Sequence, residues 1–316
     1  MLVCVSHFAQ YAWESAVTTE NALATIKPRR VLVIHNPTAG GRRRRKFERV
    51  LNALVHTGVE VDVRPTTKRG DAEAFARAAS AMTHDVIAVA GGDGTINEVV
   101  NGLSAPNLPL AVIPMGTANV LAHEIGLCGS AKEIAETIAF GAPRRISVGV
   151  VNGRRFVMMA GFGFDAYVVS QVKPAVKRLL GKMAYVLSTL AALASFKFPK
   201  YRVTVDGETF DVASAVIANG HFYGGRFVAA RHARLEDPTL HAVLFLKRGP
   251  WRAMRYAIWL TLDRLDKLPD VMIVPATDIS VERVDEGPVQ GDGDILAYLP
   301  ARITLAPAGL ALLMPG

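Results

Sequence analysis

Residues 85–102, DVIAVAGGDGTINEVVNG, decide how the first half of this chain folds. The apolar or small residues 86–90 predict a buried strand, and the apolar positions from Ile96 to Leu103 predict an amphipathic helix that begins near Thr95. Between them lies a glycine turn, GGDGT. Such a turn gathers unpaired backbone N–H groups at a helix start, and the missing side chains let a phosphate group approach closely. Phosphate is therefore the first ligand to consider.

A carboxylate, Asp93, stands inside this glycine turn. Beside a phosphate it is repulsive unless a divalent cation lies between the two groups, directly or through water. The turn therefore predicts a nucleotide bound together with Mg²⁺. The alternative is a tight structural connection in which Asp93 or Thr95 only caps the helix. The turn is not a Walker A loop or a dinucleotide fingerprint, because it lacks both GK[ST] and the spacing GxGxxG.

Length and composition indicate two domains with a substantial core, since the chain has 316 residues of which 50% are hydrophobic. The formal net charge is +8, and part of the excess is concentrated in RRRRK at residues 42–46, beside Arg29 and Arg30. This basic run is either a solvated helix start or a surface for an anionic membrane, a nucleotide or a nucleic acid. Because basic residues oppose the dipole at a helix N-terminus, a ligand or surface role gains support.

Several features of the sequence favour a cytoplasmic protein. The two cysteines, Cys4 and Cys128, are far apart, so neither a disulfide framework nor a zinc site is indicated. Residues 1–28 lack the basic start and long apolar core of a signal peptide and are expected to form an appended extension. The longest apolar stretch, residues 183–196, is too short to span a bilayer. We expect a cytoplasmic protein, either soluble or peripherally associated with a membrane.

Strands and helices alternate at short spacing in residues 29–142. This alternation predicts an α/β nucleotide-binding domain with a largely parallel sheet, whose loops converge where the strands end. After Pro143 the pairs Asn152-Gly153 and Asp206-Gly207 predict β-hairpins, and antiparallel strands dominate, with helices near residues 167–194 and 250–265. The expected strands lie at residues 31–34, 59–64, 86–90, 110–113, 146–151, 156–160, 201–205, 209–217, 240–246, 271–274 and 279–284, and the other helices at 47–54, 71–82, 117–125 and 131–140.

The glycine turn is one of several motifs that occur in a fixed order. GGDGTINEVVNG is preceded by NPTAG at residues 36–40 and followed by PMGTAN at 114–119, GFGFDA at 161–166 and DGD at 292–294. Together these motifs resemble the diacylglycerol kinase catalytic family, which includes bacterial soluble lipid kinases and, more distantly, sphingosine kinases. NAD kinases share the GGDGT core but lack the NEVxNG continuation. The resemblance covers nearly everything after Arg30.

The resemblance implies a two-domain protein with a cleft between the domains. Residues 143–300 would form the β-rich lipid-substrate domain, and the strand at residues 303–305, with the rest of 301–316, would return to the nucleotide-binding domain at 29–142. Transfer of a γ-phosphoryl group from ATP to a hydroxyl then needs a cradle with its Mg²⁺, cationic balance and a base. The candidate nucleotide-binding residues are Asn36, Thr66, Gly91, Gly92, Asp93, Gly94, Thr95, Asn97, Glu98, Gly116, Thr117 and Asn119. Of these, Glu98 serves either the ligand or the helix dipole.

The same resemblance places the general base at Asp294, where the family usually has glutamate. Aspartate is one methylene shorter, so the acceptor must lie closer or a water must intervene. Asp292 would support the site, and Asp93 would act in catalysis through the metal. The alternative is that GDGD forms only an acidic turn between two strands.

A second metal site is implied at Arg234, Asp237 and Thr239, two of which would bind through backbone carbonyls. Pro238 stands where a glycine is common in the family. An ordinary turn at Asp237-Pro238 is the alternative interpretation.

The family often carries a lysine directly after its NPxSG motif, and this chain has Gly41 there. Arg42 is the substitute source of charge, although a guanidinium does not simply replace an ammonium. Lys177, Arg178 and Lys182 are candidates for phosphate or headgroup contact in the second domain, or else they line a solvated helix face.

The sequence thus predicts an ATP- and Mg²⁺-dependent lipid kinase that phosphorylates a hydroxyl of diacylglycerol or a related membrane lipid. A membrane acceptor suits a basic, apolar-rich protein that contacts an anionic membrane surface peripherally. Two alternatives stay open: a kinase of a soluble acceptor such as NAD, and a non-catalytic nucleotide- or lipid-binding module in which the shorter Asp294 has removed turnover. No nucleic-acid partner is expected, because the arginine run lacks interleaved aromatic residues. A homodimer is compatible with the sequence.

Overall fold

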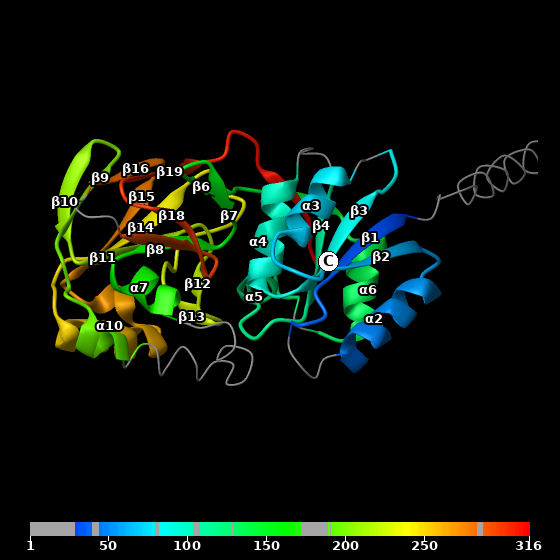
Figure 1. The fold of residues 1–316 in the computed structure, drawn as a ribbon, viewed down its shortest axis with the longest axis horizontal. Helices are drawn as coiled ribbons and strands as arrows, with labels where there is room; N and C mark the ends of the chain where they lie inside the picture. The colour runs from blue at the N-terminus through cyan, green and yellow to red at the C-terminus, as the bar shows by residue number, and fades with distance from the viewer. Residues whose placement is uncertain are drawn as a thin grey trace, which may run out of the picture.

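The chain forms two halves that lie side by side in the computed structural model, a mixed α/β half and a β-rich half (Figure 1). The structure describes residues 29–39, 44–79, 82–103, 108–127, 129–171, 189, 191–282 and 287–316. Among these, no helix is long and apolar enough to cross a membrane.

The first half is built on a six-stranded sheet in which the first five strands run parallel and the last runs antiparallel. In spatial order its strands are β2 (Glu60–Pro65), β1 (Arg30–His35), β3 (Val86–Gly91), β4 (Leu110–Pro114), β20 (Leu310–Leu313) and β5 (Pro143–Ile146). Its helices are α2 (Arg44–His56), α3 (Asp71–Ala78), α4 (Asp93–Gly102), α5 (Val120–Glu124) and α6 (Ala131–Phe140).

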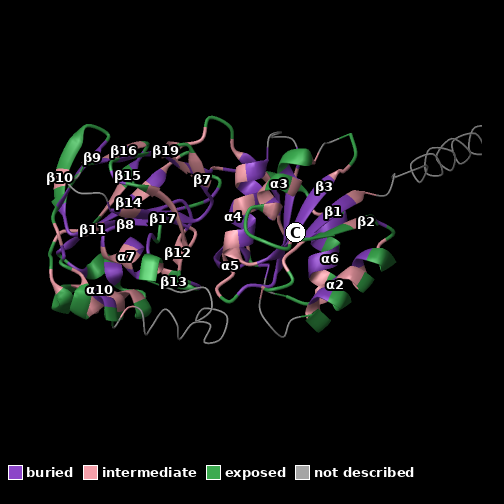
Figure 2. Cartoon of the chain, in the orientation of Figure 1, coloured by how far each residue is buried: buried purple, intermediate pink, exposed green. Residues whose placement is uncertain are grey.

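Burial explains why β3 has a continuous apolar sequence. All six of its residues are buried, as expected of a central parallel strand that is covered on both faces. The helices pack in pairs, α2 against α6 and α3 against α4. Figure 2 shows the central strands of this half buried, with the exposed residues on the outer helices and loops.

The second half contains two six-stranded antiparallel sheets that share a core of their own. One sheet has the order β10 (Glu208–Val212), β9 (Tyr201–Val205), β16 (Asp278–Glu282), β19 (Ala301–Leu305), β6 (Gly149–Val151) and β7 (Arg154–Phe156). The other has β15 (Val271–Ala276), β14 (Leu240–Phe245), β11 (Ser214–Ala218), β8 (Met159–Phe162), β17 (Pro288–Gly291) and β18 (Asp294–Tyr298). The remaining elements are α7 (Phe164–Gln171), β12 (Phe222–Tyr223), β13 (Phe227–Val228), α10 (Pro250–Thr261) and η1 (Leu265–Lys267).

The predicted architecture, a largely parallel α/β half followed by an antiparallel β-rich half, is confirmed. The return of residues 303–305 to the first half is wrong, because Ile303 pairs with Ile279 and Val151 in the β-rich core. The chain returns one strand later, at β20, which joins β4. Strand β5, at residues 143–146, closes the first sheet rather than starting the second half.

Two predicted strands each divide into two. Residues 146–151 separate into β5 and β6, and residues 209–217 into β10 and β11, with the two parts in different sheets in both cases. Alternation of apolar residues identifies a strand but does not identify its partner strand. Helices α3 and α5 are also shorter than the predicted 71–82 and 117–125.

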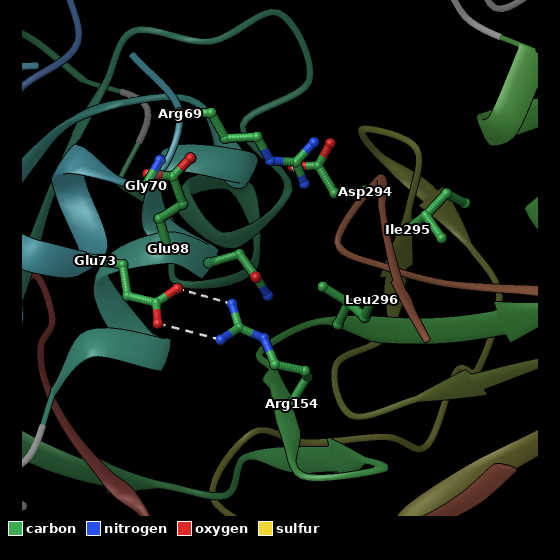
Figure 3. A pocket seen from close by; sticks show the side chains of 9 residues that line it. Arg69, Gly70, Glu73, Glu98, Arg154, Asp294, Ile295 and Leu296 are labelled. Carbon is green, nitrogen blue, oxygen red and sulfur yellow. Dashed lines mark hydrogen bonds and ion pairs between the residues drawn. The ribbon is translucent and has the colours of Figure 1, made fainter. Parts of the chain in front are cut away.

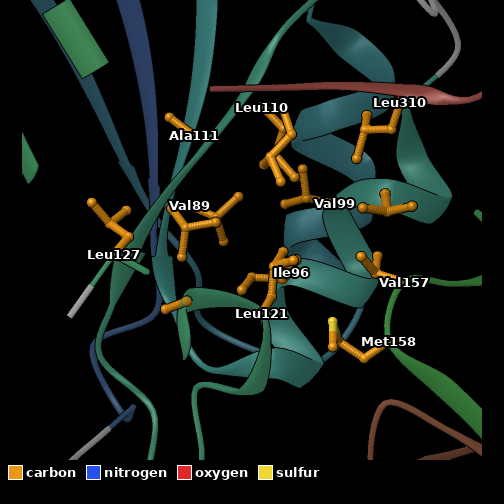
Figure 4. Packing of buried hydrophobic residues seen from close by; sticks show 14 of the residues in the cluster. Val89, Ile96, Val99, Leu110, Ala111, Leu121, Leu127, Val157, Met158 and Leu310 are labelled. Atoms are coloured by element: carbon orange, nitrogen blue, oxygen red, sulfur yellow. The ribbon is translucent and has the colours of Figure 1, made fainter. Parts of the chain in front are cut away.

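Helix α4 lies where the two halves meet. Its apolar residues Ile96 and Val99 belong to a core that extends over both halves and also contains Val157 and Met158 from the β7–β8 connection (Figure 4). The helix that follows the glycine turn is therefore fixed from both sides.

Candidate active site

The glycine turn joins β3 directly to α4. Gly92, the residue before the helix, is extended at φ −97° and ψ −177°, and within the described chain no side chain caps this helix start. A Cβ added to Gly116 would lie 2.5 Å from the Cα of Gly92, so the two turns pack backbone against backbone. The missing side chains leave a place where an anion can approach the backbone at the start of α4.

The predicted cradle residues converge at one edge of the first sheet. Asn36 and Thr66 follow β1 and β2, and the Thr66 N–H donates to His35 O at 2.8 Å. The side-chain amide of Asn36 donates to Thr95 Oγ1 at 3.0 Å, and its oxygen accepts from the N–H of Thr38 at 3.0 Å. Asn36 therefore ties the end of β1 to the glycine turn.

Asn119 borders the same edge from the turn before α5. Its backbone is left-handed at φ 48°, and its amide donates to Gly116 O at 2.8 Å. Its other side-chain atom, Oδ1, is buried and has no hydrogen-bond partner in the described part of the chain. A buried acceptor without a donor is costly, and a ligand hydroxyl or amino group would satisfy it. Thr117 is exposed beside it.

Asp93 caps a helix, but the helix is α5 and not its own. Its Oδ1 accepts the N–H of Val120 at 2.8 Å. Burial, together with the neighbouring carboxylate of Asp292, raises the pKa of Asp93 to about 6, against the effect of backbone N–H donors at the start of α5. A buried carboxylate beside a second carboxylate is the environment in which a divalent cation is stabilising, so Mg²⁺ fits this position.

Asp294 comes from a tight hairpin between β17 and β18. The two turn residues, Asp292 and Gly293, have φ values of 52° and 84°, as a type I′ turn requires. The Asp292 carboxylate accepts four N–H donors and so holds the turn in place. These donors are Asn97 Nδ2 at 2.9 Å, Val157 N at 2.8 Å, Met158 N at 2.8 Å and Met159 N at 3.2 Å. Burial raises the pKa of Asp292, and these donors oppose the rise.

The hairpin brings Asp294 against the glycine turn. A Cβ added to Gly94 would lie 2.8 Å from Asp294 Oδ2, and the Arg69 guanidinium lies 3.8 Å from the same oxygen. Asp294 opens into a cavity of about 100 Å³ between the halves, drawn in Figure 3. The residues that line the cavity are Arg69, Gly70, Glu73, Asn97, Glu98, Arg154, Asp294, Ile295 and Leu296.

A chain of polar residues, of which Gln290 is buried and Asp165 and Tyr223 are half-buried, supports the hairpin from the β-rich half. Gln290 donates from Nε2 to Asp165 Oδ2 at 2.7 Å and accepts the Gly293 N–H on Oε1 at 3.0 Å. The hydroxyl of Tyr223 donates to the other oxygen of Asp165. Burial raises the pKa of Asp165. Because Gly293 precedes Asp294, this chain fixes the position of the candidate base.

The two asparagines of NEVVNG bind across the two halves. Asn97 Nδ2 donates to Arg155 O at 2.9 Å as well as to Asp292, and Asn101 Oδ1 accepts the Arg155 N–H at 2.9 Å. Asn97 lines the cavity, but its amide is occupied by these contacts rather than directed freely at a nucleotide. Glu98 accepts the Gly70 N–H at 3.0 Å.

A bidentate ion pair closes the far wall of the cavity. Arg154 of β7 contacts Glu73 of α3 with nitrogen–oxygen distances of 3.2 and 2.9 Å, drawn as dashed lines in Figure 3. A fork geometry of this kind fixes both side chains.

Burial raises the pKa of Glu98 on the neighbouring turn of α4.

The predicted metal loop lies in the second half. Arg234 and Asp237 are exposed, and the Asp237 N–H donates to Arg234 O at 3.1 Å, which makes a turn. Thr239 is half-buried just before β14. In the described ranges no three His, Cys, Asp or Glu side chains gather as a metal site would require. A cation here would depend on backbone carbonyls, so the site stays a prediction.

Several contributors to the site were not predicted from the sequence. Arg69, Glu73 and Arg154 line the cavity, and Asp165 and Gln290 support the hairpin. Two sequence features could have pointed to them: Asp165 belongs to the GFGFDA motif, and Arg69 lies in the loop that leaves β2. The predicted charged contacts Arg42, Lys177, Arg178 and Lys182 lie outside the described residues, as do Gly41 and most of the helix predicted near residues 167–194.

Comparisons with known proteins match the two halves separately. The family model for the diacylglycerol kinase catalytic domain matches residues 30–151, and the model for the YegS C-terminal NAD kinase beta sandwich-like domain matches residues 158–314. The diacylglycerol kinase of Bacillus subtilis (strain 168) is 29% identical over 293 residues, covering 91% of this chain and 97% of that protein. A diacylglycerol kinase of Staphylococcus carnosus (strain TM300) is 27% identical over 278 residues, covering 86% and 91%.

Solved structures agree with these matches. A crystal structure of a diacylglycerol kinase from Bacillus anthracis str. Sterne has a TM-score of 0.75 at 25% identity, covering 92% of this chain and 98% of that one. Another from the same strain gives a TM-score of 0.77 at 26% identity, with coverage of 92% and 97%.

Proposed function

Because this chain belongs to the diacylglycerol kinase catalytic-domain family and is a lipid kinase, we propose that it transfers the γ-phosphoryl group of ATP, with Mg²⁺, to a free hydroxyl of diacylglycerol or a related membrane lipid. The observation that carries the proposal is the contact of Asp294 with the glycine turn. A base from one half thereby reaches the cradle for phosphate in the other.

The nucleotide would lie along the edge of the first sheet. The start of α4 would receive its phosphates, and the buried Oδ1 of Asn119 would accept a hydrogen bond from its hydroxyl or amino groups. Asp93, whose Oδ1 caps α5, would help to hold Mg²⁺. When bound, the ion would neutralise charge on the phosphates and align the γ-phosphoryl group for transfer.

The residues of the hairpin would act on the acceptor. Asp294 takes the proton of the lipid hydroxyl while the hydroxyl oxygen attacks the γ-phosphorus and ADP leaves. Arg69 beside Asp294 supplies positive charge for the oxygens of the transferred group. The shorter aspartate is compensated by the direct contact of the hairpin with Gly94.

The experiment is transfer of label from γ-³²P-ATP to lipid in mixed micelles, with diacylglycerol, other extracted lipids and NAD as separate acceptors. Wild-type protein should label a lipid in the presence of Mg²⁺ and lose this activity in EDTA. NAD belongs in the panel because the second family model describes a domain like that of NAD kinase. Labelling of NAD alone, or ATP binding with no labelled product, would contradict the proposal.

A further inference from the structure

Helix α10 has large apolar side chains on the side that faces solvent as well as on the side that packs against the core. Trp251 is 85% exposed, Ile258 50% and Leu262, directly after the helix, 59%. With Arg255 they follow the spacing i, i+4, i+7, i+11, so they form one stripe, which we call the α10 face. The buried side is marked by Tyr256, whose hydroxyl donates to Asp270 at 2.9 Å.

An apolar stripe on the solvent side is unusual for a surface helix, and α10 has it in addition to Tyr256, Trp259 and Leu260, which pack inward. The outward side of an ordinary surface helix is charged or polar, and its apolar stripe faces the core. An exposed tryptophan with two aliphatic neighbours instead marks a surface that binds a partner. Figure 2 shows α10 as a largely exposed helix at the margin of the β-rich half, and it contacts β13, where Phe227 is also exposed.

The charges around the α10 face identify the partner. Residues 247–264 contain five cationic side chains and one acidic one. The cationic residues are Lys247, Arg248, Arg252, Arg255 and Arg264. The acidic residue, Asp263, accepts the Val228 N–H, and Asp270, which pairs with Arg252 and Arg255, is buried. The surface therefore presents positive charge around an apolar stripe.

We propose that the α10 face docks on the surface of an anionic lipid bilayer. This inference rests on the proposed function, because an acceptor embedded in a membrane requires the enzyme to work at that surface. Apolar side chains with a tryptophan would enter the headgroup region while arginines contact anionic lipids. A second copy of the chain is a poorer occupant, since a two-fold contact would place the excess positive charge of one copy against that of the other.

The α10 face, rather than the basic run at residues 42–46, is then the membrane contact. The described part of that run begins α2 in the other half, where Arg44 pairs with Glu48 at 2.8 Å and Lys46 donates to Pro114 O at 3.2 Å. Arg44 and Lys46 are thus engaged by partners within the first half. The two surfaces can be separated by mutation.

The test is sedimentation of the full chain with vesicles of phosphatidylcholine, with and without 30% phosphatidylglycerol. Wild-type protein should bind the anionic vesicles, less tightly at high salt, and the variant Trp251→Ala/Ile258→Ser should bind at least tenfold more weakly. Phe140→Ser is the matched control, because Phe140 on α6 is 67% exposed in the other half. Arg44→Glu/Arg45→Glu tests the basic run.

An activity arm distinguishes failure of docking from failure of the proposed reaction. With long-chain diacylglycerol in vesicles, the α10 variant should lose activity in parallel with binding. With a short-chain, water-soluble diacylglycerol it should match wild type. If no protein labels either lipid, the reaction is wrong but the binding result still decides the docking surface.

Three results would overturn the inference. The α10 variant could bind vesicles as tightly as the Phe140→Ser control. The Arg44→Glu/Arg45→Glu variant alone could abolish binding. Analytical ultracentrifugation could show a wild-type dimer that the α10 variant loses while vesicle binding is absent in both, which would assign the face to a second copy of the chain.

Discussion

The carboxylate of Asp294 lies against Gly94, with its Oδ2 2.8 Å from the position that a Cβ on this glycine would occupy. The two residues come from opposite halves of the chain, and they meet because Asp292, two residues before Asp294, accepts a hydrogen bond from Asn97 on α4. Asp292 also accepts the N–H groups of Val157, Met158 and Met159. The hydrogen bond from Asn97 to Asp292 therefore links the candidate base to the candidate phosphate cradle across the two halves.

Gly94→Ala should lower kcat by about 10- to 100-fold, because the new methyl group displaces the Asp294 carboxylate, and a shift of about 1 Å is enough for such a loss. Tm should change little, since alanine is the better helix former and only a side-chain end must move, whereas ATP affinity should also fall to the extent that Gly94 belongs to the phosphate cradle. Steady-state kinetics with calorimetric ATP binding measures this. In an Asp294→Asn background the Gly94→Ala substitution should lower kcat little further. Full additivity of the two losses in kcat would show that the contact between position 94 and Asp294 is not their cause.

Asp93→Asn should stabilise the protein without ligand while weakening binding of MgATP. The pKa of Asp93 is raised to about 6, so between its ordinary value of 3.8 and about 6 the folded chain binds a proton that the unfolded chain releases. The free energy of unfolding of the wild-type protein therefore falls as pH rises through this window. At pH 7.5 the Asp93→Asn variant, with an amide in place of the carboxylate, should have a free energy of unfolding about 1 to 2 kcal/mol higher. Thermal unfolding of the free protein should show a higher Tm for the variant.

Added MgATP should reverse that order of Tm, because only the wild-type carboxylate gains from the ion. Asp71→Asn is the control of opposite sign: hydrogen bonds from Thr67 and Lys68 lower the pKa of Asp71, so its amide should lower Tm at pH 7.5. Equal Tm values for wild type and Asp93→Asn from pH 4 to 8 would mean that Asp93 carries no raised pKa.

Gln290→Glu should lower kcat and change the KM for ATP much less. The reason is that a second carboxylate would face Asp165 and disturb the turn at Gly293. The loss should shrink as pH falls, when the two carboxyl groups share a proton, and grow as pH rises. The swapped pair Asp165→Asn/Gln290→Glu restores one donor and one acceptor and should recover activity at all pH values. A swap as inactive as the single variant, or a pH-independent loss, would refute the positioning role of Gln290.

The strand, turn and helix of residues 86–102 could be predicted because their signals are local. Strand β3 is buried along its whole length and therefore needs an uninterrupted apolar sequence. Helix α4 is recognisable because its apolar residues recur at helical spacing. The position of Asp294 followed from the order of motifs along the chain, not from any local pattern. That order also suggested the two halves and the cleft.

The remaining features depend on contacts that local patterns do not encode. Asp93 caps α5 through Val120, a partner distant in sequence. The strand around Ile303 has the alternating pattern of any half-buried strand. Its sequence therefore does not show that Ile303 pairs with Ile279 rather than joining the first sheet. Asn97 looked like a nucleotide ligand on the first turn of α4, yet its amide binds Asp292 and Arg155.

The most direct test of the account compares phosphoryl transfer by wild-type protein and Asp294→Asn when ATP is already bound. Both proteins should bind MgATP with similar affinity by calorimetry, but in a rapid-quench experiment with diacylglycerol the asparagine variant should transfer the γ-phosphoryl group about 10²- to 10⁴-fold more slowly. Asp294→Glu, which restores the longer side chain, should retain substantial activity. Equal transfer rates for wild type and Asp294→Asn would contradict the assignment of Asp294 as the base.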